Sequence, residues 1–111
     1  MKIIKEILYM PEALEFIDSL EPKARNKVLY NLSKAQEIQN QELFKKLDGE
    51  IWEFRTLYNS MSYRLFAFWD KTRDAVVICS HGLIKKVQKT PRVEIEKAER
   101  LRKEYFETIM K

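Results

Sequence analysis

The 111-residue sequence predicts a single α+β domain, because helical and strand patterns occupy separate stretches of the chain. Residues 11–40 carry apolar side chains at three- and four-residue spacing, as amphipathic helices do. Residues 51–84 hold nearly continuous apolar runs rich in β-branched and aromatic side chains, as buried strands do. A charged stretch from residue 92 returns to helical spacing. The predicted order over residues 1–111 is strand, helix, helix, three strands, helix.

The N-terminal half is predicted to form a strand followed by a helical hairpin. Residues 2–9 contain β-branched residues and end just before Pro11, which favours a strand. Pro11 and Pro22 suit the first positions of two helices, the second running to about Asn40. The apolar stripes expected to face the core are Ala13, Leu14, Ile17 and Leu20 in the first helix and Val28, Leu29, Leu32 and Ala35 in the second.

Three strands are predicted within LDGEIWEFRTLY, SYRLFAFWD and AVVICSHGLI, which are residues 47–58, 62–70 and 75–84, the first strand following the turn at Asp48-Gly49. Asp48-Gly49 is a turn signal, and polar residues at 58–60 and 70–74 separate the strands. Strands joined by such short turns form an antiparallel meander, which the helices can cover. Thr90 and Pro91 are expected to be the N-cap and first residue of the last helix. Its expected inner stripe is Val93, Ala98, Leu101 and Tyr105.

Positive charge is concentrated near the C-terminus. Residues 1–80 contain twelve basic and twelve acidic residues, whereas residues 81–111 contain nine basic and five acidic ones, which accounts for the formal net charge of +4. The first acidic residue of that segment is Glu94, so four cations precede any acid in sequence: Lys85, Lys86, Lys89 and Arg92. Such a local basic patch favours phosphate recognition.

Several classes of protein are disfavoured by composition. Cys79 is the sole cysteine and His81 the sole histidine, so neither an intrachain disulfide nor a cysteine-rich zinc site is possible. The carboxylates show no metal-binding spacing, and we expect neither metal nor cofactor. No apolar run approaches the roughly 20 residues of a membrane span. We therefore expect a mature, soluble, cytoplasmic protein without a membrane partner.

Arg55 and Arg64 each interrupt an otherwise apolar predicted strand. An arginine in a strand ordinarily points into solvent without a special role. Here the two strands are neighbours, so both side chains can lie on one face of the sheet. Guanidinium groups stay protonated and bind phosphate through paired hydrogen bonds, so the pair is a candidate phosphate clamp. Glu53 lies two residues before Arg55 and therefore on the same face of the strand, where it can pair with the arginine or transfer a proton.

HGLIKKVQKTP, residues 81–91, is the densest part of the basic patch. Lys85, Lys86 and Lys89 can be a solvated charge run, or can bind an anionic ligand beside a helix N-terminus. Crowding among ammonium groups lowers their pKa values, which would let one lysine act as a general base. Gln88 and Thr90 are candidate hydrogen-bonding groups there. His81 can be a general acid or base, or a packed residue at a strand end.

Two stretches resemble the RelE/ParE toxin superfamily, and within it the HigB-like, phage-derived branch. They are KKLDGEIWEFRTLYNSMSYRLFAFW and HGLIKKVQKTPRVEIEKAERLRKEY, and the likeness extends over essentially the whole chain, although Leu83 stands where phenylalanine is usual. The resemblance implies a RelE-like fold and a ribosome-dependent mRNA endonuclease restrained by a cognate helix-turn-helix, HigA-like antitoxin. In such toxins the 2′-hydroxyl of the RNA attacks the adjacent phosphate without a metal.

Carried over by position, the resemblance implies roles for particular residues. Arg55 and Arg64 would stabilise the phosphate, and Lys85 and Lys86 would bind it or transfer protons. Gln88, Lys89, Thr90 and Arg92 would line the RNA-binding edge. Two other functions stay open: a ParE-like inhibitor of DNA gyrase, which shares the fold, and a non-catalytic domain that binds RNA or an antitoxin.

Overall fold

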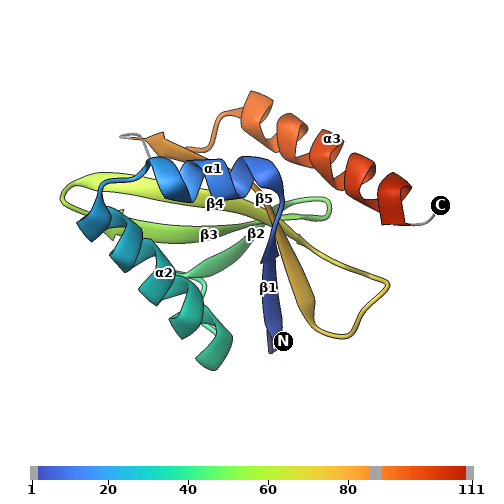
Figure 1. Ribbon diagram of the computed structural model, residues 1–111, viewed down its shortest axis with the longest axis horizontal. Coiled ribbons are helices and arrows are strands. Elements are labelled where there is room, and N and C mark those ends of the chain that lie inside the picture. Colours follow the sequence, from blue (N-terminus) through green and yellow to red (C-terminus); the bar gives the residue numbers. More distant parts are fainter. Residues whose placement is uncertain (1–2, 86–88, 110–111) are drawn as a thin grey trace.

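The computed structural model describes residues 3–85 and 89–109, and Figure 1 shows their arrangement. The predicted α+β class is confirmed, with one strand more than expected. The elements in chain order are β1 (Glu6–Tyr9), α1 (Pro11–Ser19), α2 (Pro22–Glu37), β2 (Phe44–Asp48), β3 (Ile51–Tyr58), β4 (Met61–Trp69), β5 (Val76–Lys85) and α3 (Arg92–Ile109).

The strands form one mixed sheet in the order β1-β5-β4-β3-β2. Strands β2 to β5 form an antiparallel meander, and β1 adds to its edge in parallel with β5. The predicted turn at Asp48-Gly49 is present and β3 follows it, but the residues before the turn form β2, a strand that was not predicted. Gly49 has a φ of 55°, a conformation that glycine adopts at little cost. Lys45 and Lys46 are exposed on this short edge strand, which gave it a weak hydrophobic signal.

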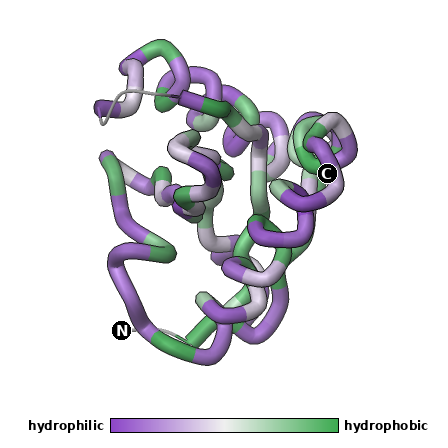
Figure 2. Tube along the Cα trace, turned by 90° about the vertical axis from the view of Figure 1, so that its left-hand side faces the viewer, coloured by the Kyte–Doolittle hydropathy of each residue, from purple (hydrophilic) through white to green (hydrophobic). Residues whose placement is uncertain are grey.

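Side chains alternate between the two faces of the sheet, and each face has its own helical cover. Phe54, Leu65 and Val77 pack with buried residues of α1 and α2. On the other face, Ile51 and Phe66 pack against Ile95 and Ala98 of α3. Figure 2 shows hydrophilic and hydrophobic residues alternating along the helical coils, as expected of helices with one buried side.

The predicted helical stripes are correct except at three positions. Leu14, Leu29 and Val93 are exposed, with Val93 64% accessible. Phe16 is partly buried against the core that α1 and α2 cover, and Ile95 of α3 is buried against Ile51 and Phe66 of the sheet. A period of 3.6 residues leaves residues at the edge of a stripe undetermined, so the orientation of each helix on the sheet decides which of them is covered.

Two helix ends differ from the prediction. Helix α2 ends at Glu37 rather than near Asn40, and α3 begins at Arg92 rather than Pro91. Because α3 begins at Arg92, Thr90 lies one residue earlier than an N-cap would, and its hydroxyl bonds to Lys85 and Glu53. Pro11 and Pro22 do open their helices as predicted, and the Glu21 carboxylate caps α2 by accepting a hydrogen bond from the Ala24 amide at 2.8 Å.

Helix α1 lies directly against β5 at Gly82. A Cβ atom on this glycine would come within 2.2 Å of the Phe16 ring. Real Cβ atoms do not approach a ring so closely, so the contact requires a residue without a side chain. Gly82 thereby sets how closely α1 covers the sheet.

Candidate functional site

Arg55 and Arg64 lie directly opposite one another on β3 and β4, on the face that α3 covers in part. The prediction that they share one face is confirmed. Their environments differ, because the Arg64 side chain is only 5% exposed and the Arg55 side chain is 25% exposed. Arg55 is therefore the more accessible of the two guanidinium groups.

Glu53 links the two arginines from the same face of β3. Its Oε2 accepts a hydrogen bond from Arg64 Nη1 at 2.5 Å and lies 3.6 Å from Arg55 Nε. The carboxylate side chain is only 2% exposed, so these charges interact with little screening by water. Arg64 Nε also donates to Ser62 Oγ at 2.8 Å. Glu53 and Ser62 together hold the Arg64 guanidinium at two of its nitrogens.

Lys85 joins this cluster from the end of β5. Its Nζ donates to Thr90 Oγ1 at 3.0 Å, and Thr90 Oγ1 donates to Glu53 Oε1 at 3.3 Å. Burial lowers the pKa of Lys85, and the positive charges of Arg64 and Arg55 lower it further, whereas the charge of Glu53 opposes that shift. A lysine in these surroundings is neutral more often than one in water. We call Glu53, Arg55, Arg64, Lys85 and Thr90 the sheet-face cluster.

The remaining residues of the predicted basic edge have different environments. Lys89 is exposed, while Lys86 and Gln88 lie outside the described residues. Arg92 is exposed and forms an ion pair with Asp48, the last residue of β2, and its Nε lies 3.8 Å from Glu96 Oε2. The positive charge of Arg92 is therefore partly balanced by Asp48, which folding brings close, and by Glu96, which lies one turn further along α3.

His81 of β5 is buried between the sheet and α3. Its ring stacks on Phe66 with centroids 4.7 Å apart, Nε2 lies 3.0 Å from Glu94 Oε1, and Nδ1 lies 3.2 Å from Ser80 Oγ. Burial, which outweighs the opposing hydrogen bond to Glu94, lowers the pKa of His81. The ring is consequently neutral near pH 7. Nε2 ties β5 to α3 through Glu94, and Nδ1 is engaged by Ser80 within β5.

Sequence reasoning missed the parts of the site that complete its hydrogen bonding. Ser62 lies two residues before Arg64, and strand alternation already places both on one face, so this partner could have been found. The bond between Thr90 and Glu53 joins residues 37 positions apart, and no local pattern indicates it.

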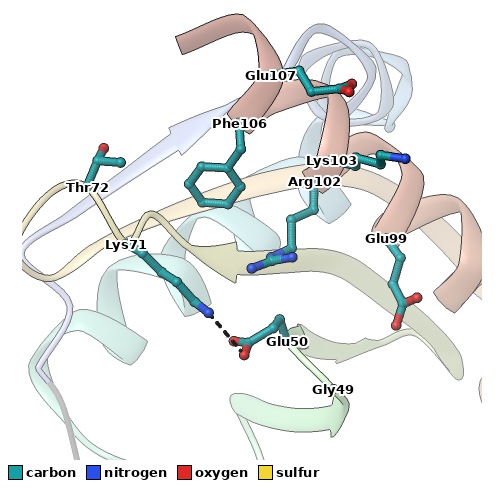
Figure 3. Close-up of a pocket in the computed structure, with 9 residues that line it drawn as sticks. All are labelled: Gly49, Glu50, Lys71, Thr72, Glu99, Arg102, Lys103, Phe106 and Glu107. Carbon is teal, nitrogen blue, oxygen red and sulfur yellow. Dashed lines mark hydrogen bonds and ion pairs between the residues drawn. The ribbon is translucent and has the colours of Figure 1, made fainter. Parts of the chain in front are cut away.

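A broad open groove lies elsewhere, between the C-terminal half of α3 and the turns after β2 and β4 (Figure 3). Arg102 and Phe106 project from α3 into it, and Lys71 donates a hydrogen bond of 3.2 Å to Glu50 across its floor. The groove is lined by three basic and three acidic side chains, so its charges largely balance. None of the residues of the sheet-face cluster lines it.

The fold and the sheet-face cluster define a small α+β protein whose sheet presents an excess of cationic groups around one buried carboxylate. The chain belongs to the family of phage-derived Gp49-like proteins (DUF891), whose model matches residues 15–103. The resemblance noted from the sequence to a phage-derived branch of RelE-like proteins is thereby confirmed.

The fold is similar to one in the crystal structure of the intact E. coli RelBE toxin–antitoxin complex. The superposition has a TM-score of 0.53 at 20% sequence identity, and covers 75% of this chain and 96% of that one. At this identity the likeness establishes the fold. The comparison with curated protein sequences gave no match.

Over residues 3–85 and 89–109, no helix has the length and apolar character needed to cross a membrane. The same residues contain no group of three or more histidine, cysteine, aspartate or glutamate side chains arranged to hold a metal ion.

Proposed function

We propose that this protein is the toxin of a type II toxin–antitoxin system and that it cleaves mRNA on the ribosome. The observation that carries the proposal is the sheet-face cluster, in which Arg55, Arg64 and Lys85 converge around Glu53. Three cationic side chains outnumber the one carboxylate, so the cluster is suited to a phosphodiester, whose charge grows as the reaction proceeds.

The proposed reaction is an internal phosphoryl transfer within the RNA. A base removes the proton of the 2′-hydroxyl, and the 2′-oxygen forms a bond to the adjacent phosphorus. The bond from phosphorus to the 5′-oxygen breaks, and that oxygen gains a proton. The products are a 2′,3′-cyclic phosphate and a 5′-hydroxyl. The chemistry requires cationic donors around the pentacoordinate phosphate, which is the role proposed for the arginines.

Lys85 is the base that we propose. Its lowered pKa increases the fraction that can accept a proton, and the nearby guanidinium groups contribute to that lowering. Thr90 is placed to orient it through the hydrogen bond to Nζ. The residues proposed to contact the RNA backbone are Lys86, Gln88, Lys89 and Arg92. We propose a structural role for His81, because both of its ring nitrogens already have hydrogen-bond partners.

A cognate antitoxin is the partner that we propose, in agreement with the toxin–antitoxin complex in which a similar fold occurs. We propose a HigA-like helix-turn-helix protein as that antitoxin, because the sequence resembles HigB-like toxins. The ribosome and translated mRNA are the other proposed partners, in the cytoplasm.

The test is induction of the protein in bacterial cells without an antitoxin. We expect growth arrest and truncated mRNAs whose new 5′ ends lie within translated regions. Blocking initiation on one reporter message should protect that message, while translated messages in the same cells are still cut. Co-expression with the adjacent small reading frame, where it encodes a helix-turn-helix protein, should restore growth.

Two results would contradict the proposal. Intact messages together with accumulated gyrase–DNA breaks would identify a ParE-like inhibitor. Intact messages without DNA damage, with retained RNA or antitoxin binding, would indicate a non-catalytic domain.

A further inference from the structure

Glu53 occupies the centre of the sheet-face cluster. Its two carboxylate oxygens contact different partners: Oε2 faces Arg64 and Arg55, and Oε1 accepts from Thr90. Through Thr90 the same carboxylate is connected to Lys85. Residues from β3, β4, β5 and the segment before α3 are thus joined by one side chain.

The geometry disfavours proton transfer by Glu53. Both of its oxygens are already bonded and its side chain is 2% exposed, so a substrate atom cannot reach it without displacing a partner. Displacement by a phosphate is also unfavourable, because a buried carboxylate would lose its counter-ions. A buried ion pair that loses one partner leaves an uncompensated buried charge, which is strongly unfavourable. Glu53 is therefore expected to keep its contacts while ligand binds.

The same contacts suit a structural task within the site. Arg55, Arg64 and Lys85 repel one another, and in the absence of ligand this repulsion favours arrangements in which they move apart. A carboxylate between them offsets the repulsion, and hydrogen bonds define the directions of the Arg64 guanidinium and of Thr90. Preorganised donors stabilise a transition state better than donors that must first be gathered.

We infer that Glu53 is a positioning residue, which holds the two arginines and the Thr90–Lys85 pair as one unit, with Arg55 as the arginine that reaches the phosphate. The inference rests on the proposed function for what the unit binds. The positioning of Arg64 and Lys85 by Glu53 is independent of that function, because it is a property of the free protein.

The first experiment compares Glu53→Gln, Glu53→Asp and Glu50→Gln in mRNA cleavage during coupled translation. Glu53→Gln removes the charge, and Glu53→Asp keeps it but withdraws it by one methylene. We expect both to reduce cleavage, by about 100-fold for the glutamine variant, as misplaced catalytic groups do. Glu50→Gln is the matched control, because Glu50 is exposed and pairs with Lys71 away from the cluster.

The pH dependence separates positioning from proton transfer. Because the negative charge of Glu53 opposes the lowering of the Lys85 pKa, its removal should move the rise of activity with pH toward lower pH while the profile keeps its shape. Loss of one limb of the profile in Glu53→Gln would overturn the inference in favour of proton transfer. Cleavage at the wild-type rate in both Glu53 variants would also overturn it.

The second experiment needs no activity. In NMR spectra of the free protein, the Arg64 Nε–H resonance should shift and exchange faster with water in both Glu53 variants, and should stay unchanged in Glu50→Gln. Should Glu53→Gln fail to fold, Glu53→Asp decides the matter. An unchanged Arg64 resonance would overturn the positioning role. If the wild-type protein cleaves no mRNA while these shifts occur, the proposed function fails and the positioning role stands.

Discussion

At the residue scale, burial distinguishes two arginines that look alike in the sequence. Both interrupt apolar strands, but Arg64 is enclosed with Glu53 and Ser62, whereas a quarter of the Arg55 side chain is exposed. A buried guanidinium whose partner is a buried carboxylate contributes to folding as well as to the site. Substitutions of the two should therefore differ in their effect on stability.

We predict that Arg55→Ala abolishes mRNA cleavage and lowers the free energy of unfolding by no more than about 1 kcal/mol, as for a partly exposed ion pair. Arg64→Ala should abolish cleavage and also cost about 3–5 kcal/mol, because Glu53 is then left buried without its closest counter-ion. Urea denaturation monitored by circular dichroism measures the difference. Equal losses of stability would show that burial does not separate the two arginines, and full activity of either variant would refute the clamp.

Lys85 gives a second prediction at this scale. Its pKa lies below the usual range, so the neutral, proton-accepting form becomes populated at a lower pH than for a lysine in water. The rate of cleavage is expected to rise with pH through that pKa. Lys85→Arg, which cannot lose its proton, should have a low rate that does not rise in the same way. A wild-type rate that is flat or falls with pH would instead assign Lys85 a purely cationic role.

At the scale of elements, β5 carries contacts on both faces of the sheet. Gly82 meets Phe16 of α1 on one face, while His81 stacks on Phe66 and bonds to Glu94 of α3 on the other. His81 and Gly82 point to opposite faces because they are adjacent in the strand. The register irregularity opposite Phe66 and Ala67 lies between Cys79 and His81 and shifts that alternation by one residue. The strand that ends in Lys85 is therefore held in place by helices on both of its sides.

We predict that Gly82→Ala destabilises the protein by about 1–3 kcal/mol, because the added methyl group overlaps the Phe16 ring. Thermal or urea unfolding gives the size of the effect. Phe16→Leu in the same chain should recover part of the lost stability, since a smaller side chain makes room for the methyl group. If the two substitutions prove additive, the close approach of α1 to β5 is not the cause.

At the scale of the whole molecule, one sheet supports two apolar layers. Leu32 of α2 is buried on one face, and Leu101 of α3 is buried on the helix that covers the other. Because the strands contribute side chains to both layers, loss of either layer exposes residues on the shared sheet. We expect the domain to unfold as one unit.

Leu32→Ala and Leu101→Ala should each lower the free energy of unfolding by about 2–5 kcal/mol. Circular dichroism of the helices and fluorescence of Trp52 and Trp69 should report the same midpoint in each variant. A loss of helical signal in Leu101→Ala that precedes the change in fluorescence would show that α3 unfolds separately from the sheet.

The sequence by itself determined the order of the elements, the sharing of one sheet face by Arg55 and Arg64, and the basic segment after β5. These properties depend on local periodicity, on strand alternation and on short connections, all of which neighbouring residues carry. The extra strand β2 escaped detection because it is short and its middle residues are exposed lysines.

Only the tertiary structure decided which charges are enclosed and which partners they have. Two contacts join residues that are distant in sequence: the bond between Thr90 and Glu53 and the ion pair between Arg92 and Asp48. The burial of Arg64 depends on the removal of water by the folded chain. Removal from water and the distance between charges set the strength of an electrostatic interaction, and folding creates both. A basic patch in the sequence thus becomes, in the folded protein, a site organised around the buried carboxylate of Glu53.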